Sequence, residues 1–183
     1  MSTQTLPDDQ TPDNATTTVS LHRLTLPGPM LRRGFWLYVW RVRTPRGERL
    51  YVGRTGDSSS PHATAPYTRM GQHLGFSKAA NSLRRLLTEA RVEPEACEQF
   101  DLISYGPIFP EIGMTKDQVR HERMLLHTPV RDQMAALEKK LRDALVLAGY
   151  SVLNTVHSKK SCDDHLWTKV RLAFSEHFPE LKS

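Results

Sequence analysis

The stretch FWLYVWRVRTPRGERLYVG, at residues 35–53, constrains the fold of this chain more than any other segment. Residues 35–43 alternate in character and are rich in aromatic and β-branched side chains, which suit a half-buried strand. Pro45 and Gly47 supply turn chemistry, and residues 48–53 resume the strand pattern. The sequence therefore predicts a β-hairpin that pairs residues 35–43 with residues 48–53.

Helical and strand patterns alternate after this hairpin. Apolar residues recur at helical spacings between residues 67 and 87, and the glycine-containing stretch in the middle indicates two helices or a break. Residues 99–109 predict a third strand. A helical region follows from residue 115, and Pro129 is expected to break it, because proline lacks the amide proton that a helix interior needs.

The clearest helix is predicted after Pro129, where an apolar stripe keeps a spacing of three and four residues. Gly149 supplies its C-terminal stop. Residues 151–156 predict a short strand, and residues 163–178 predict an amphipathic helix capped by Asp163 or Asp164. The expected fold class is α+β, with a small central sheet of three or four strands flanked by helices.

A length of 183 residues suits one domain. Residues 1–33 are expected to form a disordered tail and a connector, because they are poor in core-forming side chains and carry several prolines. Residues 34–160 are expected to form the compact domain. Residues 161–183 are expected to supply a C-terminal amphipathic helix that packs on it.

The chain is basic, with 25 Lys and Arg against 20 Asp and Glu. Three of those acids lie in the first twenty residues, so the remainder has 25 basic against 17 acidic side chains. Such an excess attracts polyanions, and nucleic acid is the expected partner. No apolar run approaches the roughly 20 residues that cross a bilayer, so no membrane partner is expected. The start of the chain lacks the pattern of a secretory signal, which predicts a cytoplasmic location.

The segment LYVGRTG, at residues 50–56, has the outline of a phosphate-binding loop. A Walker loop needs four residues between its glycines, followed by Gly-Lys-Ser/Thr. Gly53 and Gly56 are too close together, and Asp57 stands where the lysine should be. The dinucleotide fingerprint is missing as well. We therefore expect no nucleotide cofactor.

Two tripeptides in the hairpin, WLY at residues 36–38 and YVG at residues 51–53, open a longer series of polar residues. RMGQH follows with Arg69 and His73, LEKKL with Glu138, and LN with Asn154. In order and in element type, this series resembles the GIY-YIG nuclease family, over about residues 34–157. The sequence departs from the family pattern at Trp36, which stands in place of a glycine, and in an expanded loop at residues 54–66.

The resemblance implies a metal-dependent DNA endonuclease that hydrolyses phosphodiester bonds with a single divalent ion, Mg²⁺ or Mn²⁺, on double-stranded or branched DNA. It implies that Glu138 is the metal ligand and that Arg69 binds phosphate. Tyr38, Tyr51 or His73 would activate water, and this choice stays open. The remaining implied roles are site geometry for Asn154 and a structural glycine at Gly53. Nucleic-acid contacts are expected of Arg54 and of Lys159 and Lys160, which follow Asn154 and would suit the phosphate backbone in a nuclease; the alternative for the two lysines is a solvated loop.

Each of these residues also has an ordinary structural explanation. Tyr38 and Tyr51 suit strand positions in a core, and Glu138 stands four residues before Arg142, a spacing that suits a helical ion pair. Two other functions are therefore kept open. One is a catalytically inactive nucleic-acid-binding module on the same fold, and the other is a basic interaction protein unrelated to DNA.

Overall fold

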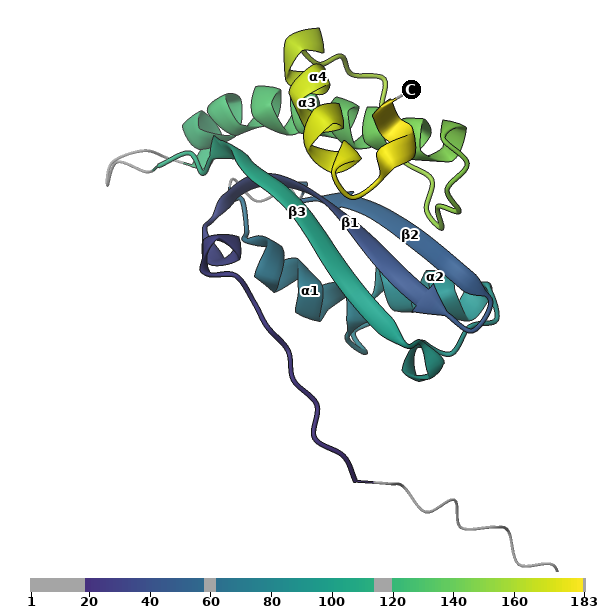
Figure 1. The fold of residues 1–183 in the computed structure, drawn as a ribbon. Coiled ribbons are helices and arrows are strands. Elements are labelled where there is room, and N and C mark those ends of the chain that lie inside the picture. Colours follow the sequence, from purple (N-terminus) through teal and green to yellow (C-terminus); the bar gives the residue numbers. More distant parts are fainter. Residues whose placement is uncertain (1–18, 58–61, 114–119, 183) are drawn as a thin grey trace, which may run out of the picture.

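A computed structural model describes residues 19–57, 62–113 and 120–182, so most of the predicted N-terminal tail lies outside the described part. A sheet lies between two layers of helices (Figure 1). The elements in chain order are β1 (Gly34–Thr44), β2 (Gly47–Arg54), α1 (Pro66–Leu74), α2 (Ser82–Glu89), β3 (Gln99–Pro110), α3 (Arg120–Leu147) and α4 (Asp164–Ser175). Short 3-10 turns lie at η1 (Gly28–Leu31), η2 (Pro94–Ala96) and η3 (Pro179–Lys182).

The sheet has three strands in the order β2-β1-β3, and both pairings are antiparallel. The predicted hairpin is confirmed, with Thr44 opposite Gly47 at the turn and Tyr38 opposite Gly53 near the other end. The predicted third strand is β3, which lies on the other side of β1. The prediction of a small α+β domain is therefore confirmed.

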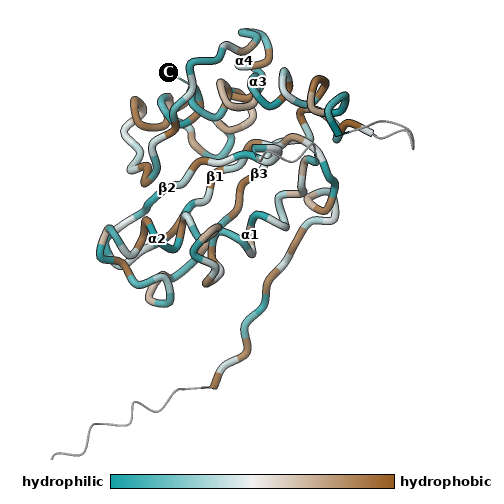
Figure 2. The backbone as a smooth tube through the Cα atoms, turned by 180° about the vertical axis from the view of Figure 1, so that it is seen from behind, coloured by the Kyte–Doolittle hydropathy of each residue, from teal (hydrophilic) through white to brown (hydrophobic). Residues whose placement is uncertain are grey.

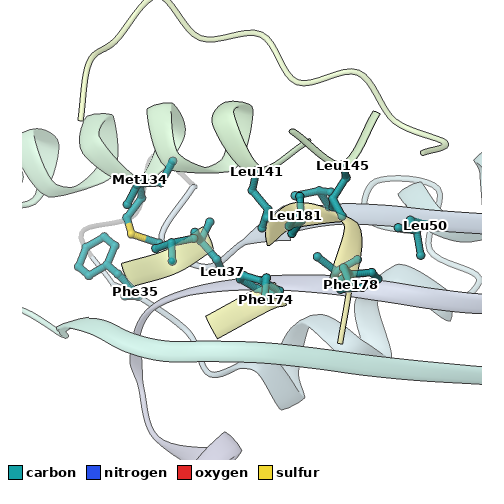
Figure 3. Close-up of a cluster of buried hydrophobic side chains, with 14 residues drawn as sticks. Phe35, Leu37, Leu50, Met134, Leu141, Leu145, Phe174, Phe178 and Leu181 are labelled. Atoms are coloured by element: carbon teal, nitrogen blue, oxygen red, sulfur yellow. The ribbon is translucent and has the colours of Figure 1, made fainter. Parts of the chain in front are cut away.

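Helices α3 and α4 cover one face of the sheet (Figure 1). The alternate strand residues Phe35, Leu37 and Val39 point into this layer and are fully buried. They pack with side chains from the helices and the C-terminal turn: Met134, Leu137, Leu141, Leu145, Val170, Phe174, Phe178 and Leu181. Figure 3 shows Phe35 and Leu37 in this cluster. Burying each such side chain contributes about 1.5–3 kcal/mol. This packing fixes the rotation of α3 on the sheet.

Helices α1 and α2 cover the opposite face. Here the intervening strand residues Tyr38, Trp40 and Tyr51 pack with Leu83 and Leu87 of α2. The side-chain period of a strand is two residues, so the same alternation that fills the first core turns both tyrosines into the second. The two motif tyrosines therefore lie on one face of the sheet.

The predicted break at Pro129 is wrong, because α3 runs through it from Arg120 to Leu147. Pro129 gives up one backbone hydrogen bond, to the carbonyl of the residue four positions earlier. That residue, Leu125, is 62% exposed, so water can bond the freed carbonyl. Core packing holds the turns that follow. No helix in the described ranges, α3 included, combines the length and apolarity that crossing a membrane requires.

The predicted strand at residues 151–156 is reduced to one isolated parallel bridge between Leu50 and Val152. Two backbone hydrogen bonds make this bridge: Leu50 N–H to Ser151 O at 2.8 Å and Leu153 N–H to Leu50 O at 2.7 Å. The chain then leaves the edge of β2. The described sheet thus has three strands rather than four.

Both predicted helix ends are confirmed. Gly149 has φ of 90°, and the amides of Gly149 and Tyr150 donate to the carbonyls of Val146 and Leu145, which closes α3 in a left-handed cap. The side chain of Asp163 accepts the Leu166 amide at 2.7 Å and caps α4.

Candidate active site

A cavity of about 360 Å³ opens beside β2, which is an edge strand of the sheet. Both helical layers contribute to it, because α1 and α2 approach from one face and Glu138 reaches it from α3 on the other. The lining residues are Tyr38, Tyr51, Gly53, Arg54, Asp57, Arg69, Gln72, His73, Ala79, Ala80, Ser82 and Glu138. The structure thus brings together five of the six residues expected to be catalytic, and Asn154 is the exception.

The strand register places the two tyrosines and the motif glycine. Tyr38 stands opposite Gly53, and Trp40 stands opposite Tyr51, so Tyr38, Tyr51 and Gly53 share one face. A Cβ atom on Gly53 would lie 2.5 Å from Cε2 and Cζ of the Tyr38 ring. No side chain fits there without moving the ring. Gly53 therefore provides the space that Tyr38 occupies.

Helix α1 supplies His73 and Arg69, which lie four residues apart on one side of the helix. Nε2 of His73 lies 2.7 Å from the phenol oxygen of Tyr38, and the His73 and Tyr51 rings are 4.9 Å apart between centroids. His73 thus contacts both tyrosines. It is 5% exposed, and its Nδ1 has no hydrogen-bond partner among the described residues.

Burial controls the protonation of these three side chains. It lowers the pKa of His73 to about 4, with a further contribution from the charge of Arg69, so the imidazole is neutral at physiological pH. Burial also raises the pKa of Tyr38 well above its usual value, and the charge of Tyr51 adds to that rise. Burial and the Glu138 carboxylate raise the pKa of Tyr51. Tyr38 is therefore protonated and His73 is neutral, and the tautomer of His73 sets which of the two donates the hydrogen bond.

Glu138 pairs with Arg54 across the cavity, with 3.1 Å between Oε2 and Nε. Both side chains are 15% exposed. Burial raises the pKa of Glu138 to about 7, although the charges of Arg54 and Arg69 oppose the rise. The alternative pairing of Glu138 with Arg142 is wrong, since Arg142 bonds instead to the Asn154 carbonyl and to Asp143.

Asp57 is a cavity residue that the sequence did not reveal. Its carboxylate forms an ion pair with the guanidinium of Arg69, and its side chain is 40% exposed. The one local feature that marks its position is Gly56, the residue before it, which has φ of 74° just after the end of β2. Gln72 and Ser82 were also missed. Gln72 accepts a hydrogen bond from Arg69 at 3.1 Å, and the Ser82 side chain lowers the pKa of Tyr51 against the larger effect of burial.

Asn154 lies outside the cavity lining. Its side-chain amide bonds both backbone groups of Val52, accepting from the amide at 3.0 Å and donating to the carbonyl at 2.8 Å. Val52 lies between Tyr51 and Gly53 in β2. Asn154 therefore acts on the cavity through the strand, by holding the backbone that carries both residues.

The three residues expected to contact nucleic acid lie apart from one another. Arg54 lines the cavity, where it is held by Glu138. Lys160 is outside the lining and pairs with Asp132 at 2.7 Å, and Lys159 is exposed beside it. The two lysines thus belong to the surface beyond α3, and the cavity has Arg54 and Arg69 as its cations.

The side chains of the cavity limit the kind of metal ion that they could bind. No group of three or more His, Cys, Asp and Glu side chains gathers anywhere in the described part of the chain. This arrangement does not fit a zinc site or an all-protein cage. The carboxylate of Glu138 does fit a single hard divalent ion that keeps waters and takes further oxygens from a phosphate.

Comparisons with known protein families, with curated proteins and with solved structures give no match for this chain.

Proposed function

We propose that this protein is a metal-dependent DNA endonuclease of the GIY-YIG type. The observation that supports this most is the convergence of Tyr38, Tyr51, Arg69, His73 and Glu138 on one polar cavity. These residues come from β1, β2, α1 and α3, so their meeting depends on the whole domain. Phosphodiester hydrolysis needs a cation for the phosphate, a proton acceptor for water and a site for a divalent ion, and this cavity holds candidates for all three.

Arg69 is the phosphate-binding residue in this proposal. Its guanidinium carries parallel N–H donors that match two phosphate oxygens. The guanidinium lies at the cavity wall and is held by Asp57 and Gln72. A phosphate that binds there replaces the carboxylate of Asp57 by another anion, so Arg69 does not have to give up a partner without gaining one.

Tyr38 and His73 form the proton-transfer pair. In the tautomer of His73 that carries its proton on Nδ1, Nε2 accepts the Tyr38 hydroxyl, and a proton taken from water by the Tyr38 oxygen is then matched by transfer of the phenol proton to Nε2. The pair avoids a free phenolate, which the raised pKa of Tyr38 makes costly. The lowered pKa of His73 makes the resulting imidazolium a strong acid that readily gives its proton up again. Tyr51 also contacts the imidazole and helps to hold it in place.

Glu138 would hold one Mg²⁺ or Mn²⁺, which supplies positive charge to the phosphate oxygens as negative charge develops on them. The carboxylate must be ionised to do so. Its pKa of about 7 places this ionisation near physiological pH. Arg54 keeps the carboxylate aimed into the cavity.

One observation favours the alternative, an inactive DNA-binding module. Both cavity arginines are paired with carboxylates, Arg54 with Glu138 and Arg69 with Asp57. A module of this kind binds DNA through exposed cations such as Lys159 and does not need the cavity. The two functions therefore differ in their response to substitutions in the cavity: the nuclease loses DNA cleavage, and the binding module keeps DNA binding.

A nicking assay on supercoiled plasmid separates them. The protein is incubated with plasmid in Mg²⁺ or Mn²⁺ and compared with Glu138→Ala and Arg69→Ala. Glu122→Ala, on the exposed start of α3, and Arg171→Ala, on the surface of α4, remove the same charges outside the cavity. We expect nicking in the native protein and in both controls, and its loss in both cavity variants.

DNA retention at low salt is measured on the same variants. Retention without nicking, across both ions and across linear, supercoiled and branched DNA, would replace the nuclease by the binding module. Loss of both nicking and retention would leave a basic protein that does not act on DNA, because phosphate contacts are strong at low salt.

A further inference from the structure

The outer edge of β3 is open. β3 is the end strand opposite β2, and no strand pairs with its outer side among the described residues. The half that ends in Pro107 and Pro110 is poorly suited to pairing, because proline has no amide proton. Residues 99–105, QFDLISY, contain no proline, and within the described part of the chain no backbone hydrogen bond reaches their outer side.

A cavity of about 700 Å³ runs along this half of the edge. Residues 99–103 of β3 form one wall, and residues 23–27 with Met30 form the other. No backbone hydrogen bond joins the two walls in the described structure. Apolar residues from both walls, from β1 and from α1 line the space: Leu24, Leu26, Met30, Trp40, Met70, Phe100, Leu102 and Ile103. We call this space the β3 slot.

The same chain carries an exposed apolar segment of matching length. Residues 19–26, VSLHRLTL, form an extended arm that leads away from the body of the domain in both Figure 1 and Figure 2. Figure 2 shows hydrophobic and hydrophilic residues taking turns along it. Val19 is 96% exposed, Leu21 is 99% exposed and Leu24 is 73% exposed. Exposed apolar side chains that follow one another along an extended segment are typical of a site that binds another surface.

The arm cannot fill the slot of its own copy in this arrangement. Residues 23–27 already form the outer wall, and residues 19–22 continue away from it. The arm of a second copy has no such constraint. Its eight residues, 19–26, match the seven residues of β3 at 99–105.

We propose that two copies of this chain exchange arms, each placing residues 19–26 in the β3 slot of the other as an added strand. The order across the contact is then β3, partner arm, own arm and partner β3. Each copy gives and receives the same segment, which is the closed two-fold arrangement expected of a homodimer. The added strand supplies the free backbone groups of residues 99–105 with hydrogen bonds, and it covers Leu21 and Leu24. This proposal does not depend on the nuclease function.

Size-exclusion chromatography with light scattering tests it on the full chain over a concentration series. We expect a dimer for the native protein and a monomer for the double variant Leu21→Asp, Leu24→Asp at the same concentrations. Both side chains are exposed in one copy, so the variant keeps its fold, which circular dichroism checks. Leu172→Asp on α4 is the matched control, since Leu172 is 66% exposed and lies outside the slot, and it stays dimeric.

Amide hydrogen exchange on residues 99–105 gives the second measurement. We expect slow exchange in the dimer and fast exchange in the arm variant. A native protein that is monomeric at every concentration overturns the proposal, and so does a dimer that survives both arm substitutions. Deletion of residues 1–18 leaves the exchanged arm intact and keeps the dimer. The proposal is also overturned if the native protein is a monomer whose residues 99–105 exchange slowly, and if deletion of residues 1–18 makes that exchange fast. That result would mean that the first residues of the same chain occupy the slot.

Discussion

The phenol oxygen of Tyr38 lies 2.7 Å from Nε2 of His73 in the interior of the domain, and each side chain is at most 5% exposed. Tyr38→Phe leaves Nε2 buried without a partner, so we expect a loss of about 1–3 kcal/mol in the free energy of unfolding. Urea denaturation measures it. Tyr67→Phe on the same helix as His73 is the control and should change little, because Tyr67 is 50% exposed. An equal effect in both variants would contradict the importance of this bond.

Gly53→Ala places a methyl group 2.5 Å from the Tyr38 ring. We expect a loss of about 1–3 kcal/mol from overpacking, measured by thermal or urea unfolding. The loss should nearly vanish in a Tyr38→Ala background, where the ring is absent. Gly71→Ala in α1 is the matched control, since a Cβ there meets nothing within 4 Å, and it should stabilise the protein by about 0.5–1 kcal/mol. A full loss in the Tyr38→Ala background would place the conflict elsewhere.

Glu138→Gln tests the raised pKa of about 7 against the ordinary value of 4.5. Below pH 4.5 the carboxyl is protonated in both the folded and the unfolded chain. Between about pH 4.5 and 7 the unfolded chain ionises first, so the native protein loses stability relative to the Gln variant as the pH rises. The relative loss should reach about 3 kcal/mol, at 1.36 kcal/mol per pKa unit. Unfolding curves of both proteins across this range measure it, and a flat difference would mean that the pKa is not raised.

The same titration predicts a pH dependence of nicking. Because the ion requires an ionised carboxylate, activity should rise through about pH 7 at limiting Mg²⁺. The midpoint should move to lower pH as Mg²⁺ is raised, because the bound ion favours the charged form of Glu138. A midpoint pH that does not change with the Mg²⁺ concentration would mean that the titrating group does not bind the metal ion.

Asp57→Asn removes the anion that competes with phosphate for Arg69. A partly exposed pair of this kind contributes about 0.5–1 kcal/mol, so we expect DNA to bind about two- to fivefold more tightly. Glu98→Gln removes the same charge from an exposed pair with Arg43 and serves as the control. Fluorescence anisotropy with a labelled duplex at fixed salt compares them. Equal tightening in both variants would point to net charge alone.

Patterns that act over a few residues predicted the local structure well. The alternation of residues 35–43 and the turn at Gly47 were enough for the hairpin, because strand period and turn chemistry are local. The caps at Gly149 and Asp163 were readable for the same reason. Pro129 misled, since the local rule for proline was overridden by the packing of the rest of α3.

The contacts within the cavity could not be predicted from the sequence, because they join residues that are distant in the chain. Arg54 and Glu138 are 84 positions apart, and their pairing depends on how α3 lies on the sheet. The series of tyrosines, arginine, histidine and glutamate predicted which residues belong to the site, but it did not predict which of them contact one another. Asp57 stayed hidden, since an acid in a polar loop has no periodicity to distinguish it.

Asn154 and the bridge at Leu50 have a consequence for how the sheet can grow. Together they occupy the outer backbone groups of Leu50 and Val52, so a further strand cannot pair with β2 at these two residues. An antiparallel sheet can gain strands at either of its two edges. At the β2 edge, the Asn154 side-chain amide already bonds the backbone of Val52. In the arm exchange proposed above, strands add on the β3 side of each copy, so the assembly ends at a pair instead of growing into a fibre.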